Sequence, residues 1–150
     1  MKIILVLCLA LLSSVCVSSD RSNNNDLTVI TESEIKSYFQ NEIDDAESTM
    51  SNFKVEIDFT LVDLNEDKLN DVIVTLVHPY FCSGLSGSGC NMFVLINKSG
   101  KLNEVLTITS NYDIEVKNKI VNNYKILMVN EQEYIFKNNE YLRNSKGNLE

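Results

Sequence analysis

Oxygen-bearing side chains recur at alternating positions between residues 63 and 71 of this chain. Asp63, Asn65, Asp67 and Asp71 occupy positions 1, 3, 5 and 9 of a nonapeptide, and the carbonyl of Leu69 stands at position 7. Such alternation turns oxygen ligands towards the inside of a tight loop around one hard cation. Because zinc prefers nitrogen and sulfur whereas calcium takes oxygen, the segment predicts a calcium site made by these five residues.

The nonapeptide resembles the DxNxDxxxD calcium loops of FG-GAP and VCBS-type repeats, of dockerins and of thrombospondin type 3 repeats. The resemblance covers residues 63–74 and implies weak calcium binding, with a Kd of roughly 10⁻⁴ to 10⁻³ M. Glu66 and Lys68 stand where those families usually have glycine, and Val74 stands where an EF-hand has glutamate. The alternative interpretation is a metal-free turn that is capped by Asp and Asn side chains.

The N-terminal residues predict export. Met1-Lys2 precedes an apolar run over residues 3–12, and small residues follow as far as Ser19, which is the pattern of a secretory signal peptide over residues 1–19. We therefore expect a periplasmic or secreted protein. The alternative is a lipoprotein with Cys16 as the lipid-attachment site. The residue before such a cysteine should be small, and here it is Val15.

The remaining residues predict a flexible polar leader over 20–30 and a single domain over 31–150. Removal of Lys2 with the signal peptide lowers the formal net charge from −8 to −9. A chain this acidic repels nucleic acid and anionic membrane surfaces, so we expect neither as a partner. No later segment approaches the ~20 apolar residues that a membrane span requires.

Two cysteines remain once Cys8 and Cys16 leave with the signal peptide. Cys82 and Cys90 bracket a Ser- and Gly-rich spacer, and in an oxidising compartment such a pair predicts a disulfide. The glycines make so short a loop easy to close. Together with the calcium-like loop, this segment is similar to small exported bacterial proteins of undefined function.

Aromatic and apolar residues accompany the predicted disulfide. His78, Tyr80 and Phe81 lead into the bracketed loop, and Leu85 lies at its centre. On a rigid loop these four residues predict an edge that recognises a partner protein of unidentified kind. The alternative is that Tyr80 and Phe81 only cover the end of the core.

The elements that position these loops follow from hydrophobic periodicity. Thr31 and Glu34 form a capping box at the start of an amphipathic helix of about 18 residues. Its apolar stripe should be core and should face the strand that follows. The stripe comprises Ile35, Tyr38, Phe39, Ile43, Ala46 and Met50.

Beyond the helix the period changes to two residues, which predicts strands. The turns between them contain asparagine and glycine, and short turns favour antiparallel neighbours. We therefore expect an α+β fold with one N-terminal amphipathic helix packed on an antiparallel β-meander sheet. The predicted strands cover 53–61, 72–77, 92–96, 105–109, 113–116, 124–129, 133–136 and 141–142.

No catalytic constellation is present in the sequence. His78 is the only histidine, and a disulfide would consume the thiol of Cys82. We therefore predict a protein that is not an enzyme: a small exported binding module, of the kind that serves as a periplasmic inhibitor or immunity-type protein. The alternatives are a hydrolase that works through carboxylates, and a purely structural envelope protein with a metal-free loop.

Overall fold

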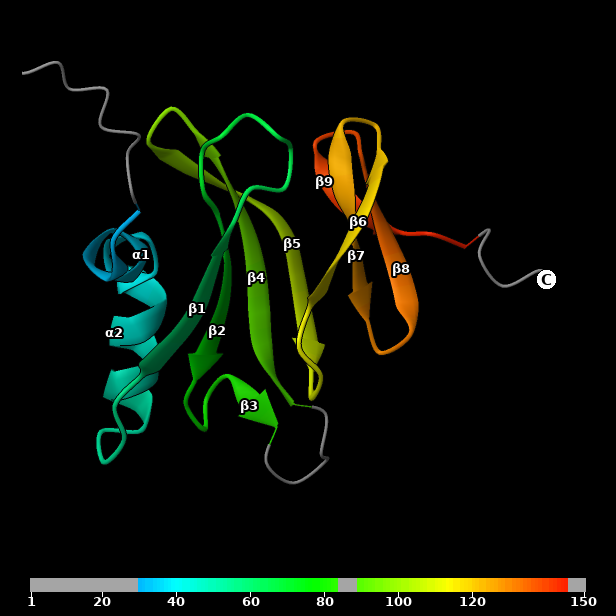
Figure 1. Cartoon of the computed structure of the whole chain (residues 1–150). Helices are drawn as coiled ribbons and strands as arrows, with labels where there is room; N and C mark the ends of the chain where they lie inside the picture. The colour runs from blue at the N-terminus through cyan, green and yellow to red at the C-terminus, as the bar shows by residue number, and fades with distance from the viewer. Residues whose placement is uncertain (1–29, 84–88, 146–150) are drawn as a thin grey trace, which may run out of the picture.

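The computed structural model describes residues 30–83 and 89–145. The polypeptide forms three layers: two short helices, a five-stranded sheet and a four-stranded sheet (Figure 1). The helices are α1 (Glu32–Tyr38) and α2 (Gln40–Thr49). The strands are β1 (Glu56–Val62), β2 (Asp71–Val77), β3 (Cys82–Ser83), β4 (Gly89–Lys98), β5 (Lys101–Ser110), β6 (Glu115–Val121), β7 (Tyr124–Val129), β8 (Gln132–Lys137) and β9 (Glu140–Arg143).

The helical segment begins as the sequence predicts and bends once. Thr31 and Glu34 form the capping box, and Ile30 packs in the same core cluster as Ile35, which closes the first turn as a hydrophobic staple. Ile30 is only 6 % exposed, so it belongs to the domain and not to the leader in which the sequence analysis placed it. The single predicted helix is divided into two at Phe39, whose ψ of 18° departs from helical geometry.

Phe39 makes helical hydrogen bonds to both sides of the bend. The Phe39 N–H donates to the Ile35 carbonyl at 3.2 Å, and the Ile43 N–H donates to the Phe39 carbonyl at 2.9 Å. The buried stripe therefore continues from α1 into α2, and Phe39 packs on the ring of Phe93. Tyr38 and Met50 lie outside the stripe, each 38 % exposed.

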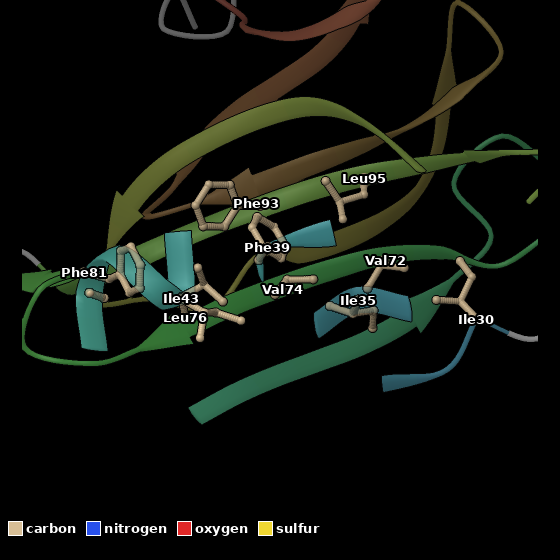
Figure 2. Close-up of a cluster of buried hydrophobic side chains, with 11 residues drawn as sticks. Ile30, Ile35, Phe39, Ile43, Val72, Val74, Leu76, Phe81, Phe93 and Leu95 are labelled. Atoms are coloured by element: carbon tan, nitrogen blue, oxygen red, sulfur yellow. The ribbon is translucent and has the colours of Figure 1, made fainter. Parts of the chain in front are cut away.

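The five-stranded sheet has its helix-facing side filled by β2 and β4. Its strands are antiparallel, with β1 beside β2, β2 beside β4, and both β3 and β5 pairing with β4. Figure 2 shows the side chains of the helices meeting those of the strands in this first core. The cluster contains Ile30, Ile35, Phe39, Ile43, Ala46, Val72, Val74, Leu76, Phe81, Phe93 and Leu95.

The opposite side of the same sheet is covered by the second sheet, whose strands run in the order β6-β7-β8-β9. All five residues from Met92 to Ile96 are buried, because β4 has a core on each face. The second core includes Leu64, Ile73, Met92, Val94, Ile96, Val105, Ile114, Leu127, Val129, Phe136 and Tyr141.

The α+β prediction is thus confirmed at the level of class, whereas the prediction of one helix on one meander sheet is not. The break in the meander falls after β5, where the Tyr112 N–H donates to the Ser110 Oγ at 2.9 Å in a bend. Tight turns join the remaining strands, and their positive φ angles at Asn130 (48°) and Asn138 (56°) are of the kind asparagine tolerates. Within the described residues, no helix has the length and apolar character needed to cross a membrane.

Candidate functional site

The calcium-like segment is the loop between β1 and β2, and its backbone makes two sharp turns. Glu66 (φ 61°) and Lys68 (φ 70°) are both left-handed, at the two positions where the sequence lacks the expected glycines. A non-glycine residue pays about 1 kcal/mol or more for this conformation. The loop therefore adopts the sharp turns at a cost that other interactions must offset.

Side-chain oxygens of the loop supply those interactions. Asp63 accepts hydrogen bonds from the N–H groups of Asn65 (3.3 Å) and Lys68 (3.0 Å). The Asn65 Oδ1 accepts from the Asp67 N–H at 3.1 Å, and the Asp67 Oδ1 accepts from the Leu69 N–H at 2.8 Å. The contacts that span two residues are Asx turns, and the Lys68 N–H to Asp63 bond closes the loop over five residues, so three of the predicted metal ligands also shape the loop.

Asp71 has a different environment, because its side chain is completely buried. Its Oδ2 accepts from the Leu64 N–H at 2.9 Å and its Oδ1 accepts from the Asn97 N–H at 2.8 Å. The carboxylate thereby connects the loop to β2 and to the end of β4. Leu64 is also fully buried, and its carbonyl accepts from the Lys125 N–H on β7 at 2.7 Å, which ties the loop to the second sheet.

Burial raises the pKa of Asp71 to about 6. The two backbone hydrogen bonds lower this pKa, and the neighbouring carboxylates of Asp67 and Asp63 raise it further. Asp71 is therefore close enough to Asp63 and Asp67 to be repelled by both, and its burial adds a penalty for its charge. A bound cation would relieve that penalty.

The hydrogen bonds of the loop leave lone pairs free on its carboxylate oxygens. Each carboxylate oxygen has two lone pairs, so an oxygen that accepts one N–H bond retains a second lone pair for a metal. Within residues 30–83 and 89–145, no group of three or more His, Cys, Asp and Glu side chains is gathered closely enough to hold a metal ion. Calcium binding would thus require the carboxylates to draw together, with Asn65 and the carbonyl of Leu69 completing the set.

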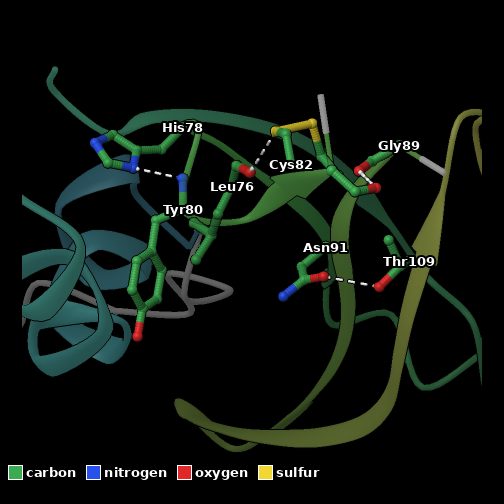
Figure 3. Close-up of a disulfide and its surroundings, with 9 residues drawn as sticks. Leu76, His78, Tyr80, Cys82, Gly89, Asn91 and Thr109 are labelled. Atoms are coloured by element: carbon green, nitrogen blue, oxygen red, sulfur yellow. Dashed lines mark hydrogen bonds between the residues drawn. A yellow bond between two sulfur atoms is a disulfide. The ribbon is translucent and has the colours of Figure 1, made fainter. Parts of the chain in front are cut away.

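The disulfide forms as predicted. The Sγ atoms of Cys82 and Cys90 are 2.03 Å apart, and the two cysteines face each other directly across the β3–β4 pair (Figure 3). The preceding turn is held by the His78 carbonyl, which accepts from the N–H groups of Phe81 and Cys82, both at 2.9 Å. Residues 78–83 are consequently held by covalent and backbone bonds.

The predicted partner-binding residues divide into separate groups. His78 (2 % exposed) and Phe81 (8 % exposed) are buried, and Phe81 belongs to the first core. Tyr80 is exposed, and its hydroxyl donates to the Asp45 Oδ2 at 2.7 Å. Leu85 lies outside the described residues. Phe81 therefore covers the end of the core, as the alternative interpretation had it, while Tyr80 remains accessible to a partner.

Sequence reasoning missed the other exposed apolar residues near this turn. Phe53 is 51 % exposed and its ring contacts His78 edge-on, with 6.0 Å between the ring centroids. We use the term aromatic surface for Met50, Phe53 and Tyr80, which lie on the two segments beside His78 and are all at least 38 % exposed. The sequence analysis placed Phe53 in the first strand and Met50 in the apolar stripe of the helix. No pattern in the sequence marks either residue as exposed.

His78 has one nitrogen without a partner. Its Nδ1 accepts from the Tyr80 N–H at 3.1 Å, whereas its Nε2 is buried and makes no hydrogen bond (Figure 3). The three pockets described on the surface do not include His78 in their lining. Asp58 and Asp113 both line a pocket of about 410 Å³, and both residues are exposed.

Comparison of the chain with models of known protein families, with curated proteins and with solved structures finds no match. The resemblance to calcium loops therefore remains a prediction that rests on the nonapeptide itself.

Proposed function

We propose that this chain is an exported, non-catalytic module that binds a protein partner through its aromatic surface and holds one calcium ion weakly in loop 63–71. The observation that carries the binding role is the exposure of two aromatic side chains, Phe53 (51 %) and Tyr80 (45 %), around a turn that a disulfide braces. Export is supported by that disulfide, because such bonds persist in oxidising compartments.

Rigidity is what makes the aromatic surface suitable for binding. An aromatic side chain on a fixed turn loses little conformational entropy when a partner covers it, and aromatic residues dominate the energetics of interfaces. Tyr80 is further restrained by its hydrogen bond to Asp45. An inhibitor or an immunity-type protein needs a preformed surface of this kind.

The calcium role is supported by the two left-handed residues and the three neighbouring carboxylates of the loop. Calcium accepts six to eight oxygen ligands in flexible geometry, and Asp63, Asn65, Asp67, Asp71 and the Leu69 carbonyl would supply five of the residues that hold it. The metal-free structural role is the competing account, since the loop closes its hydrogen bonds without an ion.

Single substitutions on the aromatic surface test the binding role. Tagged wild-type protein should retain a specific protein from an extract of the producing cell's envelope, and Phe53→Ser and Tyr80→Ser should each lose it. Ile120→Ser is the matched control, because Ile120 is 44 % exposed on β6, outside the aromatic surface. Equal retention by wild type and by both surface variants would contradict the proposal.

A further inference from the structure

A groove of about 510 Å³ opens where the two sheets meet at one end of the molecule. Residues 108–112 form one wall, at the end of β5 and in the bend that follows it. The other wall comes from the second sheet and includes Gln132, Tyr134 and Arg143. The volume lies within the range of ligand sites, roughly 300–1,000 Å³.

Arg143 is the only charged residue that lines this groove. Its side chain is exposed, and it makes none of the ion pairs found among residues 30–83 and 89–145. Most of the described cations make no ion pair, so what sets Arg143 apart is its place in the lining of the groove. The planar guanidinium group matches the two oxygens of a carboxylate and can bind them with two parallel hydrogen bonds.

The rest of the lining is uncharged and well fixed. The β7–β8 turn has left-handed residues at Asn130 and Glu131, and the Gln132 Nε2 donates to the carbonyls of Glu133 (3.1 Å) and Asn144 (3.2 Å). On the opposite wall, Tyr112 is 59 % exposed. A groove whose walls are held in this way requires little ordering when a ligand enters.

The strands beside the groove are the outer strands of their sheets. Among the described residues β5 pairs only with β4, and β9 pairs only with β8, so each is an outer strand of its sheet (Figure 1). Unpaired N–H and C=O groups on such an edge can bond to the main chain of an extended peptide. One guanidinium balances one negative charge, which suits a carboxylate better than a phosphate, whose charge at pH 7 is about −1.5 to −2.

From this arrangement we propose that the groove binds the C-terminal carboxylate of an extended peptide. Arg143 binds the carboxylate, and Tyr112 and Tyr134 contact the last side chain of the peptide. The inference deepens the proposed binding role, on which it rests, by giving the chemistry of a partner. The groove contains no residue of the aromatic surface or of loop 63–71, so the two surfaces can be tested separately.

Selection from a phage library that presents random heptapeptides with free C-termini tests the proposal. Peptides selected on wild-type protein are synthesised both as free acids and as C-terminal amides, and their Kd is measured by fluorescence anisotropy. We expect the amides to bind at least tenfold more weakly, and Arg143→Gln to weaken binding of the free acids at least tenfold. Arg143→Lys should recover part of the loss, because it keeps the charge.

Two controls separate this site from other causes. Lys137→Gln removes an exposed cation elsewhere on β8 and should leave the Kd unchanged, and Phe53→Ser should also leave it unchanged. Loss of binding in Phe53→Ser together with full binding in Arg143→Gln would place the peptide on the aromatic surface and overturn the groove assignment while leaving the binding role intact.

Other results would overturn the inference as well. Equal affinity for acids and amides would show that the carboxylate is not recognised. If every selected peptide binds wild type and Arg143→Gln with the same Kd, Arg143 is not part of a peptide site. Binding of D-galacturonate that depends on Arg143, with no binding of the peptides, would assign the groove to an acidic sugar and not to a peptide end.

Discussion

The two connections that flank β2 hold their shape by different means. Loop 63–70, which enters the strand, is closed by side-chain carboxylates that accept backbone N–H groups, including the buried carboxylate of Asp71 at the start of β2. The segment that leaves the strand is closed by a disulfide and by aromatic packing around His78. The stability of the first connection should therefore depend on pH and on cations, and the stability of the second should depend on whether the disulfide is reduced.

The largest effect should come from removal of the buried carboxylate. Asp71→Ala leaves the N–H groups of Leu64 and Asn97 without acceptors, and each unsatisfied buried group costs about 1–3 kcal/mol. We expect the free energy of unfolding to fall by about 3–5 kcal/mol in urea denaturation. Asp58→Ala is the control, because Asp58 is exposed on β1, and it should change stability by less than about 0.5 kcal/mol. Similar losses in both variants would contradict the special role of Asp71.

Loss of the disulfide should have a somewhat smaller effect, because its ring is short. The double substitution Cys82→Ser and Cys90→Ser should lower the free energy of unfolding by about 2–3 kcal/mol, chiefly through the entropy of the unfolded chain. The turn should persist, since the His78 carbonyl still holds it. Calcium-induced stabilisation should be unchanged in this variant, and its disappearance would show that the two connections are not independent.

The pH dependence of stability should identify the buried charge. The pKa of Asp71 is raised to about 6 in the folded protein, above its ordinary value of 3.8, so the folded state binds the proton more tightly than the unfolded state. The contribution of Asp71 to the free energy of unfolding is fully present below about pH 4. It falls by roughly 2 kcal/mol as the pH rises from about 4 to 6 in calcium-free buffer.

Comparison with Asp71→Asn isolates that contribution. The pKa values of Glu34 and Glu47 are lowered by their hydrogen bonds, so these groups act in the opposite direction at lower pH in both proteins. Urea denaturation from pH 4 to 7 should therefore show a decline in wild type that Asp71→Asn lacks. The same decline in both proteins would assign the effect to another group.

Local sequence patterns predicted the helices, strands and turns of this fold. They did not predict the division into two sheets, because that depends on long-range packing. The capping box at Thr31, the alternation in β1 and the asparagine turns are local features, and each is found in the structure. The division into two sheets depends on the second core, which unites Leu64, Met92 and Leu127 from distant parts of the chain. The apolar run of β2 had indicated a central strand, and the runs of β2 and β4 are the local signs of strands that are covered on both faces.

The candidate sites follow the same rule. Asp63, Asn65 and Asp67 were found by spacing because they act within one short loop, and Cys82 and Cys90 were found by composition. The burial of His78 depends on packing from Phe53 and Phe81, and the groove beside Arg143 depends on the meeting of β5 with β9. No pattern within a single segment contains that information.

Calcium titration of thermal unfolding tests the central proposal most directly. At about ten times Kd, calcium should stabilise the wild-type protein by roughly 1.4 kcal/mol and raise its Tm, by mass action on the folded state. Magnesium should do less, because it dehydrates reluctantly and requires a stricter octahedron. Asp67→Ala should abolish the calcium response, whereas Asp58→Ala should retain it. A wild-type Tm that does not change in calcium up to 10 mM would show that loop 63–71 is a metal-free turn.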